Sequence, residues 1–299
     1  LVLDYLIANY IGGNMADILM KGAEVNAAMK ERMINRVDAL KKKGVQPVIN
    51  IVRIGNRSDD LAYERGARKR MESVGVEMKI TELPEDISQA DFVKAFRKVN
   101  EDKTVYGIML FRPLPKHLDE SEIASIINPI KDVDCMSPVN IAKVFMGDEG
   151  VLAPCTAKAV MEMLVHYEVD LSGKNVAIVG RSMVVGKPLA MLMLKKNATV
   201  TVCHTRTVDL AEKCRRADVV VAAAGRAGMI TGDMISRGTV VVDVGININE
   251  EGKLCGDVEF ESVEPQASYI SPVPGGVGGV TSSVLASHVI KAAEILGKQ

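Results

Sequence analysis

Residues 176–188 read VAIVGRSMVVGKP, and we expect the second half of the chain to fold around them. Its apolar beginning is typical of a buried strand, and the residues after it are typical of a helix. Glycines at the junction let the backbone approach a pyrophosphate, and the helix N-terminus offers free N–H groups and a positive dipole end. The pattern predicts a dinucleotide site formed by Gly180, Arg181, Ser182, Val185 and Gly186. Because the spacing is GxSxxxG rather than GxGxxG, a plain connecting turn is the alternative.

Strands and helices alternate on both sides of this stretch. Strands are predicted at 47–52, 77–83, 105–110, 175–179, 199–203, 218–223 and 239–244. Helices are predicted at 17–43, 58–74, 88–100, 157–167, 187–196 and 281–296. This alternation predicts an α/β protein with parallel sheets, and 299 residues favour two domains. We place the boundary between residues 148 and 149, with a Rossmann-type parallel-sheet domain over 149–280.

Composition excludes several classes of protein. The net charge of −1 and the absence of Trp argue against nucleic-acid binding. No apolar run is long enough to cross a membrane. The five cysteines are scattered without a CxxC pair, so we expect no metal site and a cytoplasmic protein. The first methionine is Met15, and we expect residues 1–14 to be an extension whose origin the sequence leaves open.

The strand after the glycine stretch bears on the choice of cofactor. An NAD site usually has an acidic residue at this strand end, which binds the ribose 2′-hydroxyl. Here the strand ends in Cys203-His204-Thr205-Arg206-Thr207, without an acid. Arg206 and Thr205 suit a 2′-phosphate, so we expect NADP, with NAD possible. The alternative is that Arg206 is an ordinary solvated loop residue.

Two more glycine-rich loops follow strands. One contains Ile246, which we expect to bind the cofactor. The other contains Pro274, Gly275 and Gly276 just before a helix. Ligands bind at the carboxyl ends of strands in open α/β sheets, so backbone is expected to contact a flat ligand there.

Taken together, these motifs resemble the methylenetetrahydrofolate dehydrogenase/methenyltetrahydrofolate cyclohydrolase family, from about Met15 to the C-terminus. The markers are KDVD at 131–134, PCT at 154–156, GRSMVVGKP at 180–188, VDVGIN at 242–247, GDV at 256–258 and PGGVG at 274–278. The resemblance implies a homodimer that acts on a tetrahydrofolate substrate. It also implies an N-terminal α/β folate domain over 15–148, against which the C-terminal helix 281–299 packs back.

The resemblance also implies roles for individual residues. Tyr63 would stack on the aminobenzoyl ring, and Asp134 would bind the pterin ring, as the two catalytic-site residues. Pro274, Gly275 and Gly276 would contact the substrate. A core-packed tyrosine and a helix N-cap aspartate are the alternatives for Tyr63 and Asp134.

Two departures concern the hydrolytic half of the chemistry. The family carries a lysine one helical turn after the tyrosine, where this chain has Ala67. It carries a glutamine just before the Pro-Leu-Pro turn, where this chain has Phe111. Because hydrolysis requires proton transfer by positioned groups, we predict an NADP-dependent dehydrogenase with weak or absent cyclohydrolase activity.

Three other interpretations remain open at this point. The nearest is the ordinary bifunctional enzyme that produces 10-formyltetrahydrofolate, with another residue or a water in the hydrolytic role. The others are a cyclohydrolase without redox function and a nucleotide-binding regulatory protein. The intact glycine loops argue against a cyclohydrolase without redox function.

Overall fold

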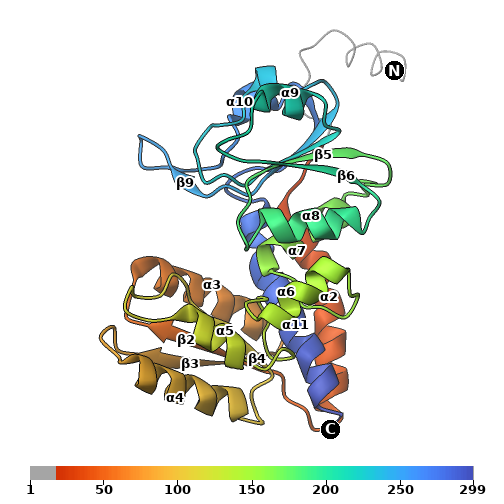
Figure 1. Ribbon diagram of the computed structural model, residues 1–299. Helices are drawn as coiled ribbons and strands as arrows, with labels where there is room; N and C mark the ends of the chain where they lie inside the picture. Colours follow the sequence, from red (N-terminus) through yellow and green to blue (C-terminus); the bar gives the residue numbers. More distant parts are fainter. Residues whose placement is uncertain (1–17, 299) are drawn as a thin grey trace. The chain divides into compact units, whose positions relative to one another are not determined.

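The computed structural model describes residues 18–298, which form two compact units (Figure 1). One unit contains residues 26–155 and 281–298, and the other contains 18–25 and 156–280. We predicted that the first domain begins at residue 15, but residues 18–25 group with the second unit. The reason is that β1 (Ile18–Leu19) extends the second unit's sheet beside β11 (Ala267–Ile270). The predicted extension, residues 1–14, lies outside the described residues.

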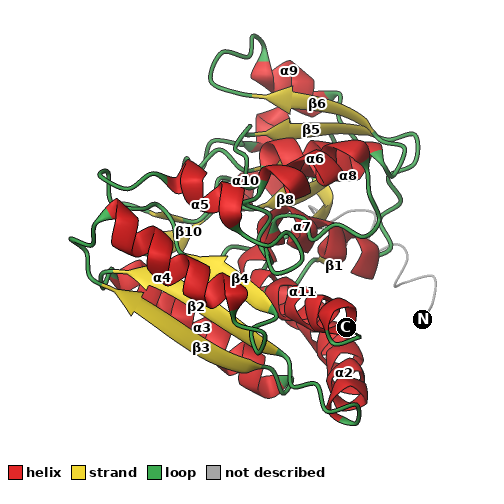
Figure 2. Cartoon of the chain, turned by 60° about the horizontal axis from the view of Figure 1, so that its bottom comes forward, coloured by secondary structure: helices red, strands yellow, loops and turns green. Residues whose placement is uncertain are grey.

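The first unit is built on a three-stranded parallel sheet in the order β3-β2-β4. Its strands are β2 (Val48–Ile54), β3 (Glu77–Leu83) and β4 (Gly107–Leu110). Phe92 and Phe96 of α4 (Gln89–Glu101) pack on one face, together with α5 (Glu120–Ile126). Figure 2 shows α4 across this face, with α3 (Ser58–Ser73) behind the sheet. Two further helices are α2 (Gly22–Lys41), which spans the boundary between the units, and α6 (Pro138–Met146).

The C-terminal helix α11 (Thr281–Leu296) packs against α3, β2 and β4 of the first unit. The packing is close enough that a Cβ on Gly107 of β4 would lie 2.8 Å from Val289. Near the end of the helix, Glu294 forms an ion pair with Arg36 at 2.8 Å. The structure therefore confirms that the chain returns to its first domain at its C-terminus.

The second unit contains a six-stranded parallel sheet in the order β1-β11-β8-β7-β5-β6. After β5 the chain adds β6 on one side and then returns to add β7 on the other. Such a reversal opens a crevice at the carboxyl ends of the strands, where open α/β sheets bind ligands. The remaining bounds are α7 (Cys155–His166), β5 (Asn175–Val179), α8 (Gly186–Leu194), β6 (Thr199–Cys203), α9 (Leu210–Arg215), β7 (Val219–Ala222), β8 (Thr239–Asp243) and α10 (Phe260–Val263).

A few short elements complete the second unit. An antiparallel hairpin is formed by β9 (Asn247–Ile248) and β10 (Leu254–Cys255), and two 3-10 turns are η1 (Gly232–Met234) and η2 (Val277–Gly279). The two-domain α/β fold with a parallel Rossmann-type sheet is confirmed. No helix within residues 18–298 is long and apolar enough to span a membrane.

Candidate active site

The first unit brings Tyr63 and Asp134 close together. Tyr63 lies on α3, directly after the turn that follows β2. Asp134 lies in the loop before α6. This loop is attached to the edge of β4, because the Ile108 N–H donates to the Lys131 carbonyl at 2.7 Å. Burial raises the pKa of the Tyr63 hydroxyl, and nearby Cys155 and Asp134 raise it further. Tyr63 is therefore a neutral, partly buried ring beside a carboxyl group.

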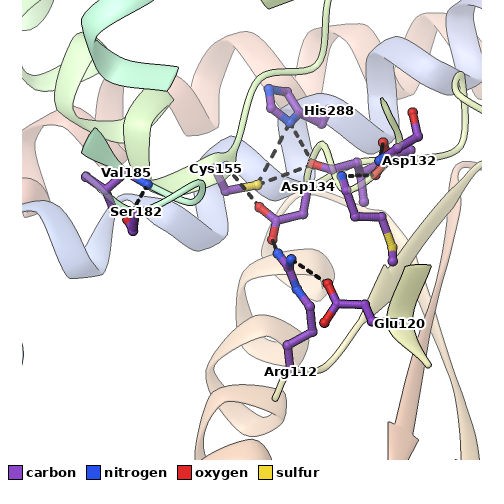
Figure 3. Close-up of polar contacts among 11 residues, drawn as sticks. Arg112, Glu120, Asp132, Asp134, Cys155, Ser182, Val185 and His288 are labelled. Atoms are coloured by element: carbon purple, nitrogen blue, oxygen red, sulfur yellow. Dashed lines mark hydrogen bonds and ion pairs between the residues drawn. The ribbon is translucent and has the colours of Figure 1, made fainter. Parts of the chain in front are cut away.

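Both oxygens of Asp134 have donors (Figure 3). The backbone N–H of Cys155 donates to Oδ1 at 3.0 Å, and the Arg112 guanidinium lies 3.5 Å from Oδ2. Burial raises the pKa of this carboxyl group, whereas the Cys155 N–H and Arg112 oppose that rise. The side chain keeps 18% of its surface exposed, so an incoming ligand can reach it.

The Cys155 thiol has a structural role. It lies 3.4 Å from the Val133 carbonyl and 3.9 Å from His288 Nδ1, and His288 Nδ1 in turn bonds the same carbonyl at 2.9 Å. Burial raises the pKa of the thiol well above its ordinary value. A neutral, buried thiol is a poor nucleophile, so these contacts fix the Asp134 loop and do not carry chemistry.

Phe111 and Ala67 surround Tyr63 with apolar groups. The Phe111 ring meets the Tyr63 ring edge to face, with centroids 5.6 Å apart. Ala67 lies one helical turn after Tyr63 and is 1% exposed. The positions where the family carries a lysine and a glutamine are thus occupied by a buried methyl group and an aromatic ring.

The other cations of α3 do not take the place of the missing lysine. Arg68 points about 100° away from Ala67 around the helix and pairs with Glu64 at 3.5 Å. Glu64 also forms an ion pair with the buried Arg53 guanidinium of β2. Among residues 18–298, the side-chain hydrogen bond of the Tyr63 hydroxyl is with Thr281 and not with a lysine or arginine.

In the second unit, the stretch after β5 has the backbone of a nucleotide loop. Gly180 has φ of +139°, and a Cβ there would lie 2.1 Å from the Ala223 carbonyl oxygen. A Cβ on Gly186, the first residue of α8, would lie 2.0 Å from the Gly180 carbonyl oxygen. Ser182 Oγ accepts the Val185 N–H at 3.0 Å, which orders the turn (Figure 3). Only glycine fits at both positions, because the backbones of Ala223 and Gly180 leave no room for a Cβ.

The turn after β6 presents Thr205 and Arg206 to solvent. It is closed by His204, whose N–H donates to Thr207 Oγ1 at 2.8 Å and whose Nδ1 accepts the Arg206 N–H at 3.1 Å. His204 is thus structural. Among the described residues no carboxylate pairs with the Arg206 guanidinium, and the same holds for Arg181, so both are available to an anion.

The loop at 272–276 is held in place by contacts with Gly22. The Gly22 N–H donates to the Gly275 carbonyl at 2.8 Å, and a Cβ on Gly22 would lie 2.3 Å from the Gly276 carbonyl oxygen. Gly275 has φ of +106°, which side-chain-bearing residues rarely adopt. Pro274, Gly275 and Gly276 therefore form an ordered backbone surface rather than a linker.

Two buried aspartates shape the loops at the carboxyl ends of β7 and β8, and the sequence did not reveal this role. Asp257 accepts the N–H groups of the loop 224–226 and the Asn247 amide, and it is fully buried. Asp243 accepts the N–H groups of Gly245, Asp257 and Val258. They hold the loop from which the Ile246 side chain extends, 66% exposed.

Family models cover most of the chain. The catalytic-domain model of tetrahydrofolate dehydrogenase/cyclohydrolase matches residues 20–134, and the NAD(P)-binding-domain model of the same family matches residues 154–296. The chain belongs to the tetrahydrofolate dehydrogenase/cyclohydrolase family. The resemblance drawn from the sequence motifs is thereby confirmed.

Relatives in this tetrahydrofolate dehydrogenase/cyclohydrolase family are similar over nearly their whole length. The bifunctional protein FolD of Clostridioides difficile is 52% identical over 93% of this chain and 96% of its own. The FolD crystal structure from Campylobacter jejuni has a TM-score of 0.90 at 38% identity, covering 93% of this chain and 98% of its own. The Trypanosoma brucei enzyme, solved with NADP and an inhibitor, has a TM-score of 0.90 at 34% identity. The match covers 96% of this chain and 100% of the Trypanosoma brucei chain.

The family marker KDVD at 131–134 combines structural and candidate functional residues. Lys131 Nζ donates to the carbonyls of Asn100 and Asp102. Asp132 is 1% exposed and accepts the N–H groups of Met136 and Ser137. Asp132 is thus a structural residue that orders the turn before α6, whose N-cap is Ser137, whereas Asp134 stays partly exposed.

Proposed function

We propose that this protein is an NADP-dependent 5,10-methylenetetrahydrofolate dehydrogenase that produces 5,10-methenyltetrahydrofolate. The observation that carries the proposal is the glycine cradle of Gly180 and Gly186 at the sheet's reversal point, in a chain of this family. NADP, when bound, supplies the hydride acceptor. The donor carbon lies between two nitrogens whose lone pairs stabilise the resulting cation, so no strong protein base is required. The protein's own contribution is to position the substrate.

Tyr63 and Asp134 are the residues proposed to hold the folate. The neutral Tyr63 ring offers a flat face for the aminobenzoyl ring. The Asp134 carboxylate suits the paired N–H donors of a pterin, because two oxygens accept two parallel hydrogen bonds. Pro274, Gly275 and Gly276 are proposed to contact the substrate through their backbone.

We further infer that cyclohydrolase activity is weak or absent. Attack of water on the amidinium carbon needs general acid–base groups. The Phe111 ring packs against Tyr63 and the nearby Cys155 thiol is neutral, and neither group is suited to proton transfer. The alternative is a bifunctional enzyme, which the name of the Clostridioides difficile relative favours. In that case a water or another group takes the hydrolytic role.

One assay tests the dehydrogenase proposal. The purified protein is mixed with 5,10-methylenetetrahydrofolate and either NADP or NAD, and methenyl formation is followed by absorbance. We expect methenyl and reduced cofactor in equal amounts, with NADP preferred. Tight NADP binding without any methenyl formation would instead support a non-catalytic, regulatory protein.

The choice of NADP depends on the turn after β6, and NADP bound in the Trypanosoma brucei relative supports it. Replacement Arg206→Ser is expected to lower kcat/KM for NADP about 10- to 100-fold and to leave NAD almost unaffected, since a hydrogen bond to a charged group contributes about 1.5–3 kcal/mol. Arg216→Ser is the control, because that guanidinium already pairs with Glu212 at 2.6 Å. Equal losses with both cofactors would remove Arg206 from the 2′-phosphate site.

We also propose a cytoplasmic homodimer. All five cysteines are free, and four of them are buried, as suits a reducing compartment. In the first unit β3 is an edge strand, with β2 on one side and no described strand on the other. An unpaired edge of this length is a natural place for a second copy to add its own strand.

A further inference from the structure

Arg112 lies between two carboxylates at the carboxyl end of β4 (Figure 3). Its Nη1 is 3.1 Å from Glu120, and its Nη2 is 3.5 Å from Asp134 Oδ2. The residue directly follows Phe111 and begins the Arg112-Pro113-Leu114-Pro115 turn. Sequence motifs assigned no role to Arg112, and the dehydrogenase proposal above does not use it.

The partial burial of the Arg112–Asp134 pair and its long distance define the effect of the guanidinium on Asp134. Arg112 is 27% exposed and Asp134 18%, so the pair is partly withdrawn from water and its attraction is only partly screened. At 3.5 Å the contact is at the outer limit of a hydrogen bond, so Oδ2 keeps its accepting capacity for a ligand. The stronger contact of Oδ1 is with the Cys155 N–H at 3.0 Å.

We propose that Arg112 is a positioning residue that keeps the Asp134 carboxylate charged and oriented toward the folate ring. The proposal rests on the proposed binding of the pterin by Asp134. Arg112 contributes its positive charge without occupying the carboxylate, whereas Glu120 anchors the other side of the guanidinium. The folate thus meets a charged acceptor even though that acceptor is largely buried.

The surroundings of Asp134 explain why such a partner is needed. The titratable groups around it are Tyr63, Arg112, Asp132, Cys135 and Cys155, with His288 next to Cys155. Arg112 is the cation among them that lowers the pKa of Asp134, whereas burial and Asp132 raise it. A protonated Asp134 loses one acceptor oxygen, so folate binding weakens as the pH falls through this pKa. Loss of Arg112 moves that acid limb to higher pH.

The test compares pH profiles of kcat/KM for the folate substrate in the full-length protein. Arg112→Met is expected to move the acid limb upward by about one pH unit. A nearby opposite charge lowers the pKa of a carboxyl group by about 1–3 units, and we expect the lower end of that range. Arg112→Lys, which keeps the positive charge, should leave the acid limb close to its wild-type position. Above the limb, kcat should stay within about twofold while KM carries the change. Arg57→Met is the matched control, because Arg57 pairs with Asp60 through both oxygens and does not face Asp134.

Two further measurements make the result decisive. Asp134→Asn must abolish the acid limb, and a limb that persists would overturn the proposal. Carbon-13 titration of the Asp134 carboxyl in the ligand-free protein must show the same upward shift in Arg112→Met, and Arg112→Gln serves if that variant does not fold. An unmoved titration overturns the proposal for Arg112. A wild-type protein that forms no methenyl overturns the proposed function instead, and the ligand-free titration still decides on Arg112.

Discussion

The double replacement Ala67→Lys with Phe111→Gln is expected to create cyclohydrolase activity about 100-fold above that of the wild-type protein. General acid–base groups contribute about 10²- to 10⁴-fold to such steps, and these two replacements restore the family's lysine and glutamine beside Tyr63. Hydrolysis is measured as the decay of methenyltetrahydrofolate absorbance. Dehydrogenase activity, measured in the same preparations, reports whether the site is still assembled.

The single replacements are expected to fall short for a physical reason. Ala67 is 1% exposed, so a lysine there is buried against its neighbours unless space is made. We expect removal of the Phe111 ring, which packs against Tyr63, to help make that space. Ala67→Lys alone is therefore expected to destabilise the protein, and Phe111→Gln alone to add little hydrolysis. A double variant that keeps full dehydrogenase activity yet hydrolyses no faster than wild type would refute the proposal that Ala67 and Phe111 limit hydrolysis.

Replacement Gly186→Ala is expected to weaken NADP binding by about 100-fold or more. The new Cβ would lie 2.0 Å from the Gly180 carbonyl oxygen and 2.9 Å from the Arg181 Cα, so the loop and the start of α8 must move apart. Displacements of about 1 Å in such sites reduce function by about 10²-fold. Fluorescence titration with NADP measures the dissociation constant.

Gly66→Ala is the matched control for this replacement. Gly66 lies inside α3, and a Cβ there would meet nothing within 4 Å. The same chemical change should therefore raise the stability by up to about 1 kcal/mol and leave the NADP dissociation constant unchanged. Wild-type affinity in Gly186→Ala would show that the loop does not approach the nucleotide.

Periodicity predicted the long elements well. The strands at 77–83, 175–179 and 199–203 and the helix from 281 to 296 have the bounds that the structure shows. β2 and β8 are buried at every position because they are covered on both faces, and their runs of Val and Ile are a strong local signal. The short elements β1, α5 and α6 were missed, since a few residues do not establish a period, and β11 was expected only as a strand without bounds before the loop at 272–276.

The candidate site was predictable only in part. Gly180 and Gly186 predicted a nucleotide loop because they lie close together in the sequence, between a strand and a helix. The roles of Asp243 and Asp257 depend on N–H groups from distant loops, so no local pattern could show them. The Arg112–Asp134 pair joins residues 22 positions apart, and it became visible only when the loop before α6 was seen attached to β4.

We propose that this chain carries out the redox half of the family's chemistry without the hydrolytic half. The most direct measurement is the decay of 5,10-methenyltetrahydrofolate in the presence of the purified wild-type protein, after the same preparation has been shown to form it with NADP. We expect decay at the rate of buffer alone, whatever the protein concentration. Decay that accelerates in proportion to protein concentration would contradict the claim and establish a bifunctional enzyme.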